Sequence, residues 1–249
     1  EEYNKALSGR RAEAIYAVTV HDTARWEKLY TSDNWGLRQV QLMLQSVGHD
    51  PGVTSGQVTA QSTQAIKDFQ TANGVNASGT ADSSTRAKLF EKYMLFLMPA
   101  KFEKTEFLGK GADANGKADF QGCSEFNPTM VFSQSEQAAF DSSADKTQRN
   151  QENSVNRRVL ALFFRAGTVV PMDKWPCPRA SESTAGCRKR FWSDHAARRG
   201  NTAERRTFAE TKDTFGCRFY DRLVVASPCE EPGGETPVET GDILLVWTP

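Results

Sequence analysis

The chain has 249 residues, of which 38% are hydrophobic and 25% are charged, as in an ordinary globular protein of one to three domains. Its 31 basic residues equal its 31 acidic residues, so no overall charge favours binding to nucleic acid or to an anionic membrane. No apolar run reaches the roughly 18 residues of a membrane-spanning helix, which argues against a transmembrane segment.

Residues 3–18, YNKALSGRRAEAIYAV, have the pattern of an amphipathic helix. Its apolar face is formed by residues at helical spacing, namely Leu7, Ala14, Ile15 and Val18. Arg11 lies on the same stripe, so its guanidinium must either reach solvent or meet an anionic partner. The polar residues 26–34 that follow are predicted to turn.

Three further helices are predicted, over residues 35–48, 62–74 and 85–98. Gly48 and Gly74 stand where the first two of them end, as C-terminal caps. The second and third helices are each preceded by a glycine, Gly56 or Gly79, and then by a Ser/Thr cluster suited to N-capping. The pattern predicts a compact three-helix unit built from two related halves.

The rest of the chain has a different character. Within residues 99–170, the stretch 101–128 is rich in glycine, and NRRVLALFFR at 156–165 is predicted to be a buried strand. Residues 171–249 are rich in arginine and end in a second strand pattern, GDILLVW at 241–247. They also hold four cysteines, which could form two disulfides, remain free thiols or bind zinc. Their spacing does not match a structural zinc site, so the leading interpretation is a pair of disulfides among Cys177, Cys187, Cys217 and Cys229.

Three blocks of this sequence resemble the OmpA-like peptidoglycan-anchoring domain. The first helix is similar to that family's signature Asn-x-x-Leu-Ser-x-x-Arg-Ala, here Asn4, Leu7, Ser8, Arg11 and Ala12. GCSEFNP at 122–128 resembles the family's Gly-x-Gly-Glu-x-x-Pro turn, although Cys123 replaces the second glycine and the glutamate is shifted to Glu125. NRRV at 156–159 is similar to the closing strand.

This resemblance implies an α/β sandwich in which two strands and a helix precede the signature helix. None of those elements is found here, so the chain is expected to begin inside a domain. The resemblance also implies that Arg11 holds the carboxylate of diaminopimelate in the peptidoglycan stem peptide. The ammonium would be held by an aspartate on a preceding loop that these residues lack. Asn4 is expected to act near the start of the helix.

The three-helix unit resembles the small peptidoglycan-binding domain of many cell-wall enzymes. The matching positions are QLMLQSVG, Gly56, Thr63, Ala65, Phe69, Gln70, Gly74, Gly79 and Thr85. The resemblance implies a shallow groove between helices as the binding face, with Gln70 and Asp68 as candidate contacts. The alternative is that both are solvated surface residues and that the unit is a scaffold.

The predicted fold class is α+β: a partial OmpA-like α/β sandwich, interrupted by a three-helix peptidoglycan-binding module and followed by a small cysteine-containing segment. The expected divisions are 1–34 (signature helix and connection), 35–98 (inserted module), 99–170 (closing strands) and 171–249 (cysteine- and arginine-rich segment).

The predicted function is non-catalytic binding or anchoring to peptidoglycan in the periplasm or cell envelope. No nucleophile elbow, phosphate-binding loop or paired His/Glu metal pattern occurs, so no catalytic residue, metal or cofactor is expected. Two alternatives stay open. One is a structural component (spike, cap or anchor) of a secretion or contractile injection assembly, with other subunits as partners. Its location would then be an extracellular or secreted particle. The other is the targeting region of a wall hydrolase.

Overall fold

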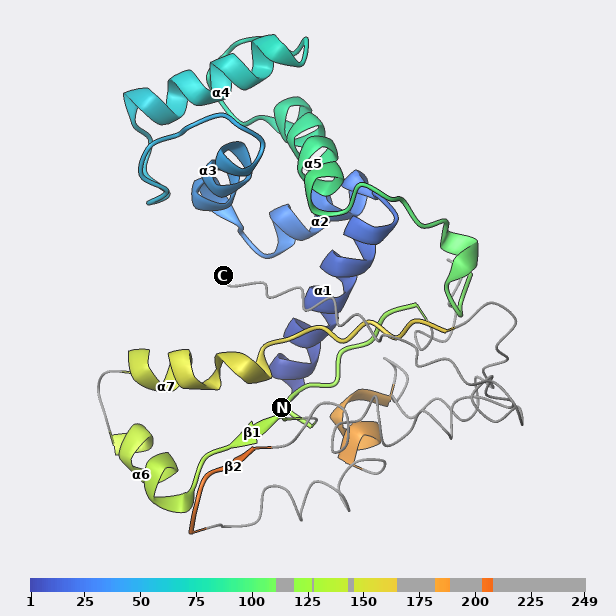
Figure 1. Ribbon diagram of the computed structural model, residues 1–249, viewed down its shortest axis with the longest axis vertical. Helices are drawn as coiled ribbons and strands as arrows, with labels where there is room; N and C mark the ends of the chain where they lie inside the picture. The colour runs from blue at the N-terminus through green and yellow to red at the C-terminus, as the bar shows by residue number, and fades with distance from the viewer. Residues whose placement is uncertain (111–118, 127, 143–145, 165–181, 189–202, 208–249) are drawn as a thin grey trace, which may run out of the picture. The chain divides into compact units, whose positions relative to one another are not determined.

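A computed structural model describes residues 1–110, 119–126, 128–142, 146–164, 182–188 and 203–207. The described part is mostly helical, with one small two-stranded sheet (Figure 1). The chain divides into two compact units. One, the helical unit, is Glu13–Glu106. The other, the discontinuous unit, combines Glu1–Ala12 with Phe107–Pro249, and the division falls within α1 (Glu2–Thr19).

The helical unit is a bundle in which α5 contacts both α2 and α3, and α3 contacts α4. The helices are α2 (Thr23–Ser32), α3 (Gly36–Ser46), α4 (Ala60–Ala72) and α5 (Ser83–Leu97), followed by the short η1 (Lys104–Glu106). Their shared core is apolar and includes Val40, Leu44, Ile66, Phe69, Leu89, Phe90 and Met94. The three helices predicted over residues 35–98 are therefore confirmed, and Gly48 and Gly74 both take the positive φ of a helix end, at 90° and 67°.

The turn predicted for residues 26–34 is wrong, because most of this segment belongs to α2. Asp22 caps the helix by accepting a hydrogen bond from the Arg25 backbone N–H at 3.0 Å. Trp26 and Leu29, one helical turn apart, are both buried. The Trp26 ring lies edge-on to Trp35 and to Phe90, with centroid distances of 5.5 Å. The segment forms a helix because burial of Trp26 and Leu29 completes the core of the helical unit.

The two ends of the helical unit meet. The Phe102 backbone N–H donates to the Thr19 carbonyl at 2.8 Å, and His21 Nε2 lies 2.8 Å from the Met98 carbonyl oxygen. Lys104 also pairs with Asp22 at 3.1 Å. The chain therefore enters and leaves this unit at neighbouring positions.

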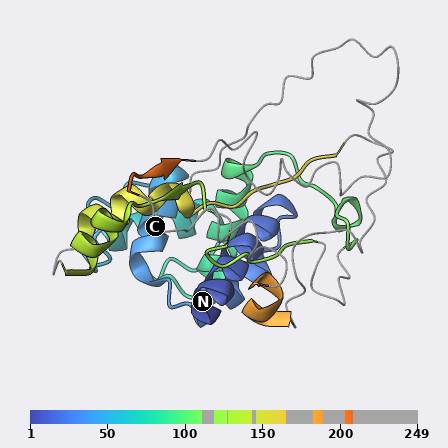
Figure 2. The same ribbon diagram turned by 90° about the horizontal axis from the view of Figure 1, so that it is seen from below.

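The discontinuous unit contains β1 (Met130–Val131), which pairs antiparallel with β2 (Arg206–Thr207). Its helices are α6 (Gln134–Ser142), α7 (Thr147–Glu152) and the short η2 (Asn153–Asn156). Helices α6 and α7 lie beside this strand pair in both views, which differ by a rotation of 90° (Figure 1 and Figure 2). A further helical turn covers residues 183–188.

The buried strand predicted at 156–165 does not form. Residues 157–164 have no regular secondary structure, and Leu160 and Phe163 are 43% and 62% exposed. Asn156 explains how the chain runs past β1 without a ladder: its side chain, rather than a strand backbone, bonds to the Met130 N–H and carbonyl, at 3.1 and 2.8 Å. The described residues therefore give no support to an OmpA-like sandwich. The strand predicted at 241–247 lies outside them.

Candidate functional site

The loop between α3 and α4 is fixed by the side chain of Gln41, which is fully buried. Its Oε1 accepts the Gly56 backbone N–H at 2.8 Å, and its Nε2 donates to the Gln57 carbonyl at 2.9 Å. Gly56 has φ +83°, a conformation that favours glycine. One side-chain amide therefore holds two successive backbone groups of a left-handed turn.

The loop between α4 and α5 is fixed in the same way by Gln70, which is also fully buried. Its Oε1 accepts the Gly79 N–H at 2.9 Å, and its Nε2 donates to the Thr80 carbonyl at 2.9 Å. Gly79 has φ +78°. The Gln70 Nε2 also lies 2.8 Å from Thr85 Oγ1 and 3.1 Å from Ser78 Oγ.

Each glycine is followed, three residues later, by the N-cap of the next helix. Thr59 and Ser62 form a reciprocal capping box at the start of α4. Asp82 accepts the Thr85 N–H at 2.8 Å at the start of α5, and this hydrogen bond lowers the pKa of Asp82. The internal repeat predicted from the sequence is thus confirmed, and its hidden part is the buried glutamine that precedes each glycine. We name these two structures the Gly56 turn and the Gly79 turn.

The Gly56 turn belongs to a loop that carries two exposed valines. Val53 and Val58 are 76% and 78% exposed. The loop is also held at its other end, where Asp50 accepts the Gly52 N–H at 2.9 Å and the Gln61 Nε2–H at 3.1 Å. Apolar side chains displayed on a loop held at both ends form a ready contact surface.

The two predicted contacts on α4 have different surroundings. Asp68 is exposed and accepts a hydrogen bond from Gln64 Nε2 at 2.8 Å. Gln70 has no exposed surface, because its amide is turned inward to the Gly79 turn. The structure therefore does not bring Asp68 and Gln70 together on one face, and it gives Gln70 a role in shaping the loop.

In the discontinuous unit, the start of α1 contacts residues 119–126, so two of the sequence blocks meet. Asn4 Nδ2 donates to Glu125 Oε2 at 2.6 Å. Ser8 Oγ accepts the Ser124 N–H at 2.9 Å, and Lys5, which is buried, donates to the Gly122 carbonyl at 2.9 Å. Asn4 thus links the start of α1 to the second sequence block.

Arg11 lies half-buried on α1 and has no hydrogen bond or ion pair with any residue that the structure describes. Burial lowers the pKa of its guanidinium, and the positive charge of Arg157 lowers it further. Arg157 belongs to the third sequence block, NRRV. The positive charges of two arginines from separate blocks therefore influence each other.

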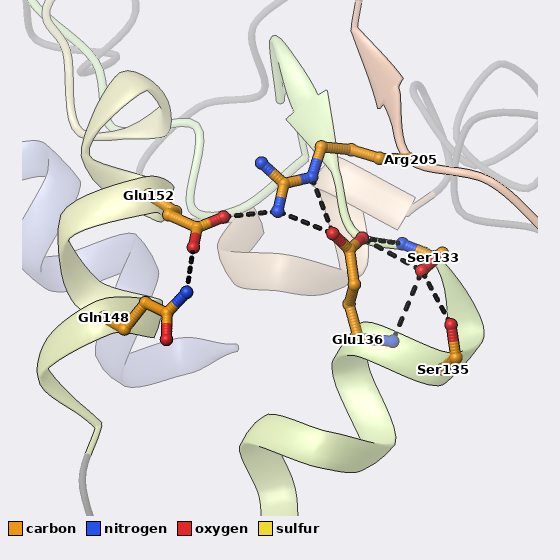
Figure 3. A network of polar contacts seen from close by, with 6 residues as sticks. All are labelled: Ser133, Ser135, Glu136, Gln148, Glu152 and Arg205. Carbon is orange, nitrogen blue, oxygen red and sulfur yellow. Dashed lines mark hydrogen bonds and ion pairs between the residues drawn. The ribbon is translucent and has the colours of Figure 1, made fainter.

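A polar network joins α6, α7 and the start of β2 (Figure 3). Arg205 donates two hydrogen bonds to Glu136 Oε1, at 2.9 and 2.6 Å, and a further one to Glu152. Ser133 caps α6 and donates its N–H to Glu136 at 2.9 Å. The bonds from Arg205 lower the pKa of Glu136 to about 2. All three charged side chains are paired with one another, so this network serves structure rather than ligand binding.

Only two of the five cysteines, Cys123 and Cys187, lie in the described residues. Cys187 is a buried free thiol whose pKa is raised by burial, and Cys123 is a partly buried cysteine. Cys177, Cys217 and Cys229 lie outside the described residues, so the predicted disulfides stay a prediction. Among the described residues no group of histidine, cysteine and carboxylate side chains is arranged to hold a metal ion.

Comparison with protein families gives a match within the helical unit. Residues 36–89 match a family described as a putative peptidoglycan binding domain. The match begins at α3 and ends within α5, so it contains both glycine turns. No OmpA-like domain is supported. Comparisons with curated proteins and with solved structures give no significant match. In the described part of the chain, no helix has the length and apolar character needed to span a bilayer.

Proposed function

We propose that this chain is a non-catalytic protein of the bacterial cell envelope that anchors to peptidoglycan through its helical unit. The observation that carries the proposal is the family match at residues 36–89, which coincides with a complete repeat of capped helices and fixed turns. A rigid surface suits binding to a wall polymer because little conformational entropy is lost on contact. We propose the periplasm or cell envelope as its location, because peptidoglycan lies there.

The discontinuous unit supplies a second, separate part of the proposal. The hydrogen bond from Asn4 to Glu125, and the electrostatic effect of Arg157 on Arg11, support the idea that the three OmpA-like blocks act together. In that arrangement Arg11 would bind the carboxylate of diaminopimelate, since it is a half-buried cation without a carboxylate partner among the described residues. Replacing Arg11 by alanine should then weaken binding to diaminopimelate-containing muropeptides while the fold is kept.

The test is co-sedimentation of the full chain with purified peptidoglycan sacculi. Insoluble cellulose serves as the matched control, because it offers a polysaccharide surface without peptide stems. Saturable binding to sacculi that is released by soluble muropeptides, with none to cellulose, is the expected result. Equal sedimentation with both materials, or with neither, would contradict peptidoglycan binding.

A further inference from the structure

The segment matched to the peptidoglycan-binding family contains four basic residues. Two of them are paired with carboxylates: Arg86 with Glu27 in the bundle, and Lys88 with Glu91 on its surface. Arg38 and Lys67 are the other two. Both are exposed, and neither has a hydrogen bond or ion pair with any residue in the described part of the chain. Within this matched segment, two cations are therefore uncompensated.

These two cations occupy equivalent positions of the repeat. Arg38 precedes Gln41 by three residues on α3, and Lys67 precedes Gln70 by three residues on α4. Residues three apart on a helix share a face, so each cation stands next to the glutamine that holds a turn.

Each cation also lies directly against the glycine of its turn. A Cβ atom on Gly56 would be 3.3 Å from the Cβ of Arg38. A Cβ atom on Gly79 would be 2.9 Å from Cε of Lys67. The side chain of Lys67 therefore covers the Gly79 turn, and the base of Arg38 adjoins the Gly56 turn.

We propose that Arg38 and Lys67 are paired contact residues for the carboxylate groups of peptidoglycan stem peptides, one at each glycine turn. The inference rests on the proposed function and assigns the part of the polymer that the unit binds. Most of the sugar surface is uncharged, whereas the stem peptides carry free carboxylates, which guanidinium and ammonium groups bind by charge-assisted hydrogen bonds.

Two features near the first site fit a peptide better than a sugar. Val53 and Val58 are exposed on the loop that contains the Gly56 turn, and they offer apolar contact to short side chains such as alanine. Asp50, the acidic residue of the same loop, is hydrogen-bonded to Gly52 and Gln61. Two equivalent sites on one rigid unit would also bind a repeating polymer more tightly than either site alone.

The experiment uses the full chain and sacculi stripped of accessory phosphate polymers, so that peptide carboxylates are the main anions. Arg38→Gln and Lys67→Gln should each weaken binding about fivefold, which corresponds to ~1 kcal/mol. Lys88→Gln is the matched control: it removes the same charge from the same segment, but from a paired side chain, and should change binding less than twofold. Arg38→Lys and Lys67→Arg keep the charge and should keep most of the binding.

A second arm uses sacculi whose carboxylates have been converted to neutral amides. This arm is run in an Arg11→Ala background, which removes the other proposed carboxylate contact. Binding of that chain should fall to the level of the double variant that also carries Arg38→Gln and Lys67→Gln, and the double variant itself should be unaffected by amidation. If binding of the Arg11→Ala chain survives amidation, or if the double variant binds like that chain, the assignment of Arg38 and Lys67 is overturned while peptidoglycan binding stands. If the wild-type chain does not bind sacculi at all, the proposed function fails first and the inference falls with it.

Discussion

Replacing Gln70 by leucine should strongly destabilise the helical unit. The amide of Gln70 makes hydrogen bonds to Gly79 and Thr80, and to Thr85. Leucine fills similar space but offers neither donor nor acceptor. The Gly79 N–H is buried, so it would be left without a partner, and the Thr80 carbonyl would depend on water or on the long 3.4 Å contact with Thr85.

The magnitude follows from these stranded groups. A buried polar group without a partner costs about 1–3 kcal/mol, so one fully buried group and one partly solvated group together cost roughly 2–5 kcal/mol. The equivalent change, Gln41→Leu, should cost less, roughly 1–3 kcal/mol, because Gly56 is only partly buried and Gln57 is exposed.

Urea unfolding of the full chain measures the free energies, and amide hydrogen exchange at Gly79 localises the effect. Gln64→Leu is the control: it makes the same substitution on the same helix, but Gln64 is exposed and bonds only to Asp68. Its free energy of unfolding should stay within about 0.5 kcal/mol of wild type. A Gln70→Leu chain that unfolds like the Gln64→Leu chain and keeps a protected Gly79 amide would refute the reasoning.

Three further predictions concern the discontinuous unit. Gly122→Ala should detach residues 119–126 from α1, because the new Cβ would lie 2.3 Å from the Gly9 backbone nitrogen. Gly9→Ala is the control and should fold normally, because its Cβ would have no neighbour closer than 4.0 Å. Hydrogen-exchange protection of α1 distinguishes the two variants. The pKa of Glu136 is about 2 in the folded chain, below its ordinary value near 4.5. The stabilisation from Arg205 should therefore be fully present above pH 4.5 and lost as the pH falls through about 2. A titration of the Glu136 carboxyl by NMR with a midpoint near 4.5 would contradict this. Cys187 should alkylate slowly in the native chain at pH 8 and fully after denaturation without reductant, as mass spectrometry would show; resistance after denaturation would mean that it is in a disulfide.

The repeat in residues 35–98 could be predicted because its signals are local. A glycine at a helix end and a capping side chain three residues after a turn act on their own neighbours, so single residues such as Gly48 and Thr59 reveal them. Gln41 and Gln70 could not be recognised in this way. A glutamine on a helix resembles a surface residue, and its burial depends on a turn 15 or 9 residues further along.

The strand predicted at 156–165 is an element that the sequence favours but the structure does not form. An apolar run such as VLALFF has a high preference for strands, but a strand also needs a neighbouring strand, and that partner cannot be read from the run itself. Leu160 and Phe163 are exposed in the structure. The OmpA-like resemblance had the same weakness, since it rested on short blocks. The structure joins the first two blocks through Asn4 and Glu125, and it bonds Asn156 of the third block to Met130. The described residues do not supply the sheet around them.

The helix α2 shows why the boundaries of the binding unit matter, since it lies before the family match. Trp26 is 1% exposed and donates its indole N–H to the Ala14 carbonyl at 2.9 Å, while Glu27 accepts hydrogen bonds from Arg86 of α5. Removing a buried tryptophan costs about 3–5 kcal/mol, a large part of the 5–15 kcal/mol that stabilises a typical domain.

A fragment covering residues 35–98 should therefore be only marginally folded, whereas one covering 13–106 should unfold cooperatively, because it keeps the Trp26 ring against Phe90 and the contact between Thr19 and Phe102. Circular dichroism during urea unfolding compares the two fragments directly. Equal midpoints would mean that α2 is a dispensable addition to the domain. A lower midpoint for the shorter fragment would mean that the binding surface at the Gly56 and Gly79 turns depends on residues that lie before the matched family.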